Sequence, residues 1–278
     1  MKKSQHFSIK KLVTHLILIL SGITFVFPFF WMIITSLKSP NEIFSWPPIF
    51  IPEKIMWSNY ADVFSSIPII RMFFNSLFVS VTVTLGTVIF CALAAYSFAR
   101  LRFPGREFIF KLYLGTMMVP VMVTMIPMFV IMKYFGWIDT YYALIVPGFF
   151  GNAFGTFLLR QFFMSLPTQL DDAARIDGCS YFSTFYRILL PLMKPPMAAL
   201  AVFTFMGVWN DFLWPLITVQ SDEMKTLSIG LASFQGLYAT QYHLLMAAAV
   251  ISVIPVLIAY LSSQKYFIEG ITLTGMKG

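Results

Sequence analysis

Six long apolar segments alternate with short polar segments along this chain. They lie at about residues 13–35, 73–98, 108–131, 140–159, 197–219 and 242–262. Each has roughly the 20 residues that an α-helix needs to cross about 30 Å of hydrocarbon. A buried soluble core does not explain apolar runs of this length and number. The pattern therefore predicts an all-α integral membrane protein with six transmembrane helices.

The composition agrees with this pattern. Of the 278 residues, 58% are hydrophobic and 11% are charged, and the mean hydropathy is +0.78. A soluble domain would carry roughly 25% charged residues. The surplus of apolar side chains makes the bilayer the expected solvent.

The distribution of Lys and Arg predicts the orientation. Most of the 19 basic residues lie in segments on one side of the six spans. The other side holds Lys38, Lys54, Arg71, Lys133 and Lys225. Because basic residues favour the cytoplasmic side, both termini are expected inside. The net charge of +7 then follows from topology, without a basic patch of the kind that binds nucleic acid.

The first apolar segment continues through Phe27 to Trp31 with no small-residue cleavage site after it, so it is expected to remain as a span. Cys91 lies in a span and Cys179 in an inner loop, which excludes a disulfide framework. The three His residues are scattered, and no metal-ligand spacing exists.

The chain divides into three parts by this pattern. Residues 1–72 hold the inner N-terminus, the first span and an outer segment rich in Pro and aromatic residues. That segment is expected to lie at the outer membrane interface, with docking of a partner as the alternative. Residues 73–262 form the main transmembrane domain, including an inner loop at 165–196, and residues 263–278 form an inner tail.

A charged island interrupts the apolar pattern from Asp171 to Pro196. A short helix is predicted from Leu170 to Ile176, with Asp171 and Asp172 in its first turn, where negative charge is favourable. Gly178 can take the left-handed conformation that ends a helix, and Ser180 can cap a second helix. Pro191 is predicted to end the second helix.

This arrangement is a helical elbow with one apolar face and a cluster of charges. It lacks the base, nucleophile or metal ligands of a catalytic site, so no enzyme activity is expected in this chain. It suits the groove of a soluble partner, and mechanical coupling is the function that it favours.

The elbow resembles the EAA loop of permease subunits of bacterial ABC importers. The matching positions, in order and spacing, are Asp172-Ala173-Ala174, Asp177-Gly178, Phe185, Ile188, Leu190-Pro191 and Pro195. The departures are Asp172 for the usual Glu and Cys179 for the usual Ala. The shorter Asp172 reaches less far toward a basic partner residue.

Three further segments resemble the carbohydrate-uptake branch of that family, and within it the smaller permease of maltose-type importers. They are Phe98-Ala99-Arg100-Leu101-Arg102-Phe103-Pro104-Gly105, Trp209-Asn210-Asp211-Phe212 and the run from Gln264 to Gly270. The resemblance implies a type I ABC importer permease fold in the bacterial cytoplasmic membrane. It also implies a second permease, an ATPase dimer that binds ATP and Mg, and an extracytoplasmic sugar-binding protein.

The resemblance assigns roles to individual positions. The elbow from Asp171 to Phe185 would be the coupling helix, and Asp172 would meet a basic side chain of the ATPase. The residues implied in ATPase coupling are Asp171, Asp172, Ala173, Ala174, Arg175, Asp177, Gly178, Phe185 and Pro191. The tail from residue 264 would lie against the ATPase, and the outer loop 220–241 would approach the binding protein.

Asp211 is the one acidic residue inside a predicted span, roughly 21 Å from the inner end of its helix. A charge at that depth is a functional candidate. The alternative is that Asp211 and Asn210 bond neighbouring helices or a helix end near an outer gate. The polar stripe of the second span, which includes Asn75, Ser76 and Ser80, is read as interhelical hydrogen bonding before a water-lined path.

The sequence disfavours two rival functions. A membrane transferase using Asp171 and Asp172 fails because Arg175 stands where a metal-binding carboxylate is needed. An ion-coupled secondary transporter would need more intramembrane charge than Asp211 alone. The chain has no GxxxxGK[ST] loop, so ATP energy would come from a separate subunit.

Overall fold

A computed structural model describes residues 9–236 and 240–275 of the chain. Within these residues the regular structure is helical, apart from a single antiparallel bridge between Gln235 and Thr240. The chain forms two compact units, one of Met1–Ile67 with Leu231–Val253 and one of Pro68–Gly230 with Ile254–Gly278. The prediction of an all-α protein is confirmed.

The first unit contains α1 (Ile9–Ser36), α2 (Pro40–Ile43), α3 (Ser58–Ser66) and the start of α15 (Tyr242–Gly275). The Asn59 amide donates to the carbonyl oxygens of Ser36 at 2.8 Å and Lys38 at 2.9 Å, which fixes α3 against the end of α1. Lys38 is fully buried, and its ammonium lies 4.2 Å from the Trp31 ring centroid. Desolvation lowers the pKa of Lys38 below its ordinary value, although Glu42 opposes this.

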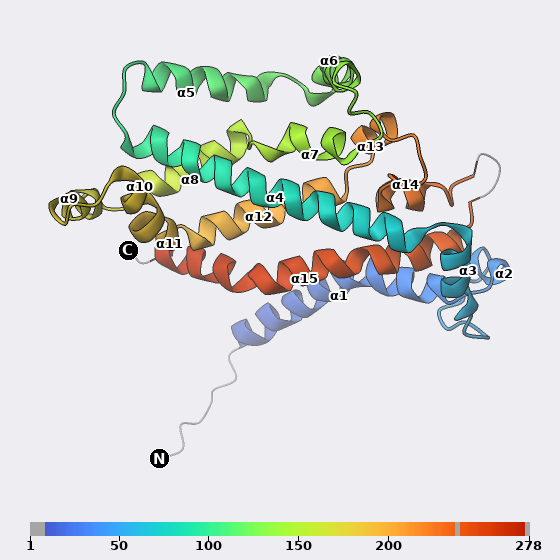
Figure 1. Ribbon diagram of the computed structural model, residues 1–278. Coiled ribbons are helices and arrows are strands. Elements are labelled where there is room, and N and C mark those ends of the chain that lie inside the picture. Colours follow the sequence, from blue (N-terminus) through green and yellow to red (C-terminus); the bar gives the residue numbers. More distant parts are fainter. Residues whose placement is uncertain (1–8, 237–239, 276–278) are drawn as a thin grey trace. The chain divides into compact units, whose positions relative to one another are not determined.

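The second unit is built around α4 (Ile69–Arg100), which runs alongside α7 (Tyr141–Phe149), α8 (Ala153–Ser165) and α12 (Lys194–Trp209) (Figure 1). Small residues permit the close approach. A Cβ atom on Gly86 would lie 2.5 Å from the Phe149 carbonyl oxygen, and one on Gly155 would lie 2.8 Å from Cys91 Sγ. These contacts bring α4 into the centre of the unit.

Three of the predicted spans are interrupted. The segment predicted at 108–131 is α5 (Arg106–Gly115), the short η1 (Thr116–Met118) and α6 (Val121–Tyr134), with a 98° bend. Pro120 stands at the bend and lacks the N–H that a continuous helix needs. The segment at 140–159 is broken between α7 and α8, where Asn152 Oδ1 accepts the Gly155 N–H at 2.8 Å and caps α8.

The segment at 197–219 is interrupted between α12 and α13 (Leu213–Thr218). In the described part of the chain, four helical stretches are long and apolar enough to cross a membrane, or up to six if each of two bent pairs is one span. The second bent pair joins Tyr181–Leu192 to Lys194–Trp209 at 78°. Our sequence prediction placed residues 181–192 in an inner loop instead.

The last helix is longer than predicted. α15 runs from Tyr242 to Gly275, past the predicted end at residue 262 and into the predicted tail. Residues 276–278 of that tail, residues 1–8, and residues 237–239 of the outer loop lie outside the described residues. The backbone of the tail from residue 264 is therefore helical as far as residue 275.

Candidate coupling site

The first half of the elbow is α9 (Gln169–Ile176), which carries Asp171 and Asp172 in its first turn. Its end is a Schellman motif: the Gly178 N–H donates to the Arg175 carbonyl at 3.0 Å, and the Cys179 N–H donates to the Ala174 carbonyl at 2.9 Å. Gly178 has φ of +76°, which is favourable for glycine because it has no Cβ atom. The predicted left-handed cap at Gly178 is confirmed.

The second half starts at Ser180, whose hydroxyl oxygen accepts the Ser183 N–H at 3.2 Å. The predicted cap at Ser180 is therefore confirmed. The chain continues through α10 (Tyr181–Ser183), the π-helical turn η2 (Thr184–Leu189) and α11 (Leu190–Leu192). The predicted end at Pro191 is confirmed to within one residue, since the helix ends at Leu192 and the chain bends by 78° before Lys194. Pro191 directly follows the π-helical turn η2, and it lacks the N–H that would continue the backbone hydrogen bonding of the helix.

Part of the elbow is buried in the core of the second unit. Ala174, Phe185 and Leu189 are buried. The Phe185 ring centroid lies 5.1 Å from that of Tyr96 on α4, and the Tyr96 hydroxyl donates to the Tyr181 carbonyl at 3.1 Å. Of the residues implied in coupling, Ala174 and Phe185 thus position the elbow from inside.

The remaining residues of that set face outward. Asp172, Ala173, Arg175, Asp177, Gly178 and Pro191 are exposed, and Asp171 is half-buried. Between them lie two large apolar side chains, Ile176 at 88% exposure and Phe182 at 68%. The outward surface therefore combines charge with apolar area, as a protein-binding surface does.

An ion pair joins the elbow to the end of α4. Arg100 Nη1 lies 3.5 Å from Asp171 Oδ2, and these side chains are 7% and 17% exposed. Arg100 Nη2 also donates to the Leu166 carbonyl at 2.7 Å, just before α9. Sequence reasoning missed this pairing, although Arg100 lies inside one of the motifs that carried the resemblance.

A second buried arginine was also missed. Arg160 on α8 lies 2.7 Å from Glu107 of α5, donates to the Phe98 carbonyl at 3.1 Å, and stacks 4.1 Å from the Phe110 ring centroid. Its position at the inner end of an apolar run was the available signal. Together, Arg100 and Arg160 tie α4, α5, α8 and α9 into one inner assembly.

Asp211 lies in the break between α12 and α13 and not in a helix interior. Its Oδ1 accepts the Trp214 N–H at 3.4 Å, and its carbonyl oxygen accepts the Ser228 hydroxyl at 2.6 Å. Asn210 donates to the Met206 carbonyl at 2.8 Å. This geometry matches the helix-end alternative. Both side chains also line a cavity of about 610 Å³ with Met122, Met125 and Pro147.

The outer loop after α13 is fastened to α4 and to the turn before α7. The Asn75 amide donates to the carbonyls of Glu223 at 2.8 Å and Lys225 at 2.9 Å, and the Ser76 hydroxyl accepts the Leu227 N–H at 2.8 Å. The polar stripe was predicted to form hydrogen bonds between helices. Asn75 and Ser76 do form structural hydrogen bonds, but these bind the loop, so the prediction is confirmed only in part. Ser80 is buried without a hydrogen-bond partner in the structure described.

Asp139 fastens the other end of this loop, and sequence reasoning did not single it out. It has φ of +61°, and its carboxylate accepts hydrogen bonds from the N–H groups of Gln220 at 2.9 Å and Ser221 at 3.0 Å. Burial raises the pKa of Asp139, but the hydrogen bonds from Ser221 and Gln220 outweigh it and hold the pKa below its ordinary value.

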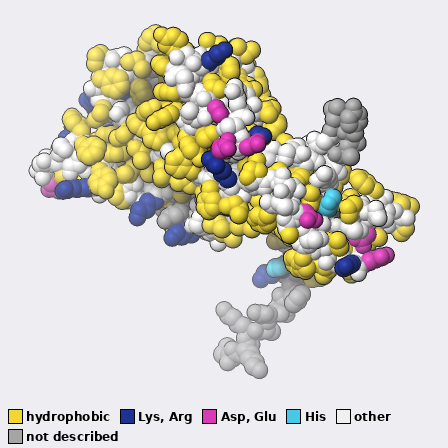
Figure 2. All heavy atoms as spheres, turned by 45° about the vertical axis from the view of Figure 1, so that its right-hand side comes forward, with side chains coloured by type: hydrophobic (Ala, Val, Ile, Leu, Met, Phe, Trp, Pro, Cys, Tyr) yellow, Lys and Arg dark blue, Asp and Glu magenta, His cyan; other side chains and the backbone are white. Residues whose placement is uncertain are grey.

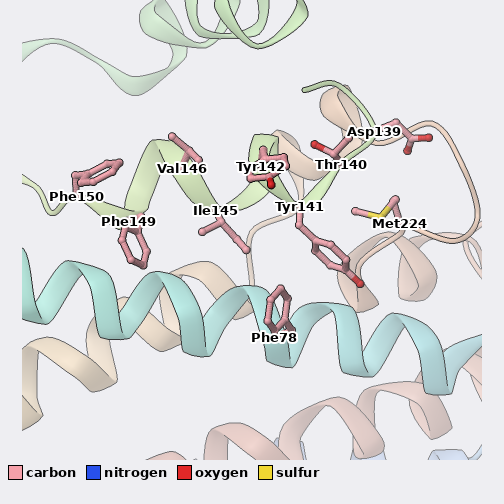
Figure 3. Close-up of a pocket in the computed structure, with 10 residues that line it drawn as sticks. All are labelled: Phe78, Asp139, Thr140, Tyr141, Tyr142, Ile145, Val146, Phe149, Phe150 and Met224. Atoms are coloured by element: carbon pink, nitrogen blue, oxygen red, sulfur yellow. The ribbon is translucent and has the colours of Figure 1, made fainter. Parts of the chain in front are cut away.

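Asp139 also lines an apolar cavity of about 610 Å³ between α4 and α7 (Figure 3). Tyr141 and Phe78 meet edge to face there, 5.1 Å between centroids, and the Tyr141 hydroxyl donates to Asn75 Oδ1 at 2.6 Å. In residues 9–236 and 240–275, no three His, Cys, Asp or Glu side chains are grouped to hold a metal ion. Cys91 and Cys179 are free thiols.

Apolar helices packed around α4, with an exposed elbow at one end, define a multi-helix membrane protein with a surface suited to a soluble partner. Figure 2 shows hydrophobic side chains over much of the visible face, with charged side chains in small groups. Residues 88–272 match the family described as "Binding-protein-dependent transport system inner membrane component". The chain belongs to this family.

Individual relatives agree with the family. The chain is 38% identical, over all of both chains, to the arabinooligosaccharides transport system permease protein AraQ of Bacillus subtilis. It is 34% identical to the sn-glycerol-3-phosphate transport system permease protein UgpE of Pectobacterium atrosepticum, covering 93% of this chain and 94% of the relative.

Solved structures show the same fold. A bacterial ABC transporter that imports the acidic polysaccharide alginate matches with a TM-score of 0.81 and 25% identity, over 96% of this chain and 99% of that one. A second alginate ABC transporter structure, in complex with a periplasmic protein, matches with a TM-score of 0.65 and 17% identity, over 92% and 94%.

The protein is therefore a multi-pass permease subunit of an ABC importer in the cytoplasmic membrane. The family is a transport component of the inner membrane and not an enzyme family. Neither the secondary transporter nor the membrane transferase finds support in the relatives.

Proposed function

We propose that this chain forms half of the pathway of an ATP-driven oligosaccharide importer, and that a second permease forms the other half. The elbow from Asp171 to Pro196 binds one subunit of an ATPase dimer, which holds ATP and Mg. ATP binding closes the dimer, and the elbow carries that movement to the helices. Six spans place both termini and the elbow inside, in the three parts 1–72, 73–262 and 263–278.

The observation that carries the coupling role is the division of the elbow into a buried and an exposed side. Phe185 packs on Tyr96 inside the unit, while Ile176 and Phe182 are exposed to solvent on the other side. An apolar surface of this kind favours burial in a partner's groove. The ion pair between Asp171 and Arg100 connects the elbow, which would lie in the partner's groove, to α4.

On the outer side, we propose that an extracytoplasmic sugar-binding protein approaches the loop 220–241. The family description names dependence on a binding protein, which supports this partner. Asn75 and Asp139 fasten residues 220–225 of the loop to the second unit, so a bound protein would meet a fixed surface there.

An oligosaccharide is favoured over a glycerol phosphate as the substrate. Relatives transport arabinooligosaccharides in one case and sn-glycerol-3-phosphate in another, according to their names. The charged side chain lining the cavity at the α12–α13 break is Asp211, a carboxylate. A carboxylate and the Asn210 amide suit sugar hydroxyls, and the carboxylate repels a phosphate.

The test is co-purification of the tagged full-length chain from membranes of its own host in mild detergent. We expect an ATPase subunit and a second permease to accompany the wild-type chain. The variant Ile176→Asp should lose the ATPase and keep the second permease, because a charge on the exposed apolar surface opposes burial. Ile176→Leu is the matched control and should keep both.

Two outcomes would overturn the proposal. If no ATPase accompanies the wild-type chain, the importer function is wrong for this protein. If the ATPase accompanies Ile176→Asp as well as it accompanies Ile176→Leu, the elbow is not the coupling site. Uptake of radiolabelled oligosaccharides and glycerol phosphate by the same strain then decides the substrate class.

A further inference from the structure

A basic hollow lies between the end of α4, the start of α5 and the elbow. Its volume is about 490 Å³, and its lining includes Arg100, Arg102, Arg106 and Arg175. Two carboxylates, Asp171 and Asp172, also line it. Four guanidinium groups against two carboxylates make the hollow attractive to an anion.

The charges in the basic hollow are only partly used. Arg106 is bonded to Glu107 at 3.0 Å, and Asp171 is paired with Arg100. Arg100 Nε is nevertheless buried without a hydrogen-bond partner, and in the part of the chain that the structure describes Arg102 makes no hydrogen bond or ion pair. A buried donor without a partner is costly, so a bound acceptor would be stabilised there.

The surroundings of Arg102 and Arg106 are apolar on one side. Both residues also line an adjoining hollow of about 470 Å³ that includes Phe103 and Phe108. On α5, which starts at Arg106, Phe108, Ile109 and Leu112 are exposed. Guanidinium groups thus lie directly beside a surface suited to hydrocarbon.

We propose that the basic hollow binds the phosphate of an anionic phospholipid from the cytoplasmic leaflet, with an acyl chain along Phe103 and Phe108. The proposal rests on the proposed function, which places this end of α4 inside. Guanidinium groups bind phosphate through paired, charge-assisted hydrogen bonds. Basic pockets between helices on this side of a membrane suit lipid headgroups.

Bound lipid would also hold the elbow. Arg175 belongs to α9 and lines the hollow, while Arg102 belongs to the segment after α4. A phosphate between them links the two elements in addition to the Arg100–Asp171 pair. The lipid would then stabilise the elbow in one position relative to α4.

The test uses the full-length chain, purified in neutral detergent and then mixed with phosphatidylglycerol and phosphatidylcholine. Native mass spectrometry measures which lipid stays bound. We expect the wild-type chain to retain phosphatidylglycerol preferentially. Arg102→Gln should weaken that retention by about five-fold, the ratio for one cationic side chain at an anionic lipid surface. Arg102→Lys should restore most of it.

Lys111→Gln is the matched control, because Lys111 is an exposed cation on α5 that does not line either hollow. Equal losses for Arg102→Gln and Lys111→Gln would mean general attraction and overturn the site. If millimolar inorganic phosphate displaces the bound lipid, and the chain shows no preference for phosphatidylglycerol over phosphatidylcholine, the hollow is a site for soluble phosphate instead.

A third outcome concerns the ATPase. If phosphatidylglycerol is retained by the isolated chain but is absent from the chain purified with its ATPase, the subunit covers the hollow and the lipid proposal is wrong. Retention is measured without transport or ATP hydrolysis. A failure of the lipid proposal can therefore be distinguished from a failure of the proposed coupling function.

Discussion

Arg100 at the end of α4 and Asp171 in the first turn of α9 form a largely buried ion pair, with 3.5 Å between Nη1 and Oδ2. The two residues belong to separate sequence motifs, and the pair joins the central helix of the unit to the elbow. Any movement of α9 therefore acts on α4 directly. This connection is the basis of the first prediction.

Arg100→Gln should loosen the elbow, since it leaves Asp171 without its partner in a poorly solvated position. We expect amide hydrogen exchange in residues 169–176 to become at least ten-fold faster, and substrate uptake to fall while membrane insertion stays normal. The matched control is Lys111→Gln, which removes an exposed cation of α5 that lines neither hollow. Unchanged exchange in Arg100→Gln would show that the pair does not hold α9.

Gly178→Val should uncouple ATP hydrolysis from uptake. The left-handed backbone at Gly178 costs a residue with a Cβ atom about 1–2 kcal/mol, and a β-branched residue more. No neighbouring atom lies within 4 Å of the added Cβ, so the effect is conformational and not steric. Gly178→Asn should retain coupling, because Asn tolerates this conformation. Equal transport by both variants would contradict the prediction.

Gly86→Ala should destabilise the helix packing by about 1–3 kcal/mol, because the new Cβ meets the Phe149 carbonyl, which is backbone and cannot rotate away. The measurement is the thermal aggregation temperature in detergent. Gly22→Ala in α1 is the control, since no atom lies near that position. A similar aggregation temperature for the two variants would show that α4 and α7 are less closely packed than the Gly86–Phe149 contact implies.

Asp139 should make the outer loop sensitive to acid. Its pKa is lower in the folded chain than in the unfolded one, so its carboxylate adds stability above the ordinary Asp value of about 4. That stability is lost as the pH falls through the lowered folded value. The difference in unfolding temperature between wild type and Asp139→Asn should therefore shrink in acid. A constant difference would exclude this role.

Asp211→Asn should fold normally and still take up oligosaccharide, since the Asn side-chain oxygen can accept the Trp214 N–H and sugar hydroxyls, but it should discriminate less against glycerol phosphate. Asp211→Ala should lose this bond and lower the yield of folded protein. Uptake assays, normalised to the amount of folded protein, distinguish a loss of transport from a loss of folding in the two variants. Abolished oligosaccharide uptake in a well-folded Asp211→Asn protein would show that the sugar itself needs the charge.

Local signals in the sequence were sufficient for the membrane class and for the ends of the elbow. Long apolar runs predict spans because the bilayer requires them, and Gly178 and Ser180 predict caps because each acts on its own backbone. The resemblance of the elbow to a known loop then indicated the family, which the match over residues 88–272 shows.

Other features depend on residues far apart in the chain. The break at Asn210 to Phe212 could not be read from apolar runs, because hydropathy does not register where backbone hydrogen bonds stop. The pairs Arg100–Asp171 and Arg160–Glu107 require helices to pack side by side. Composition and local pattern determine which segments enter the membrane, whereas tertiary packing decides which buried charges and loop ends meet.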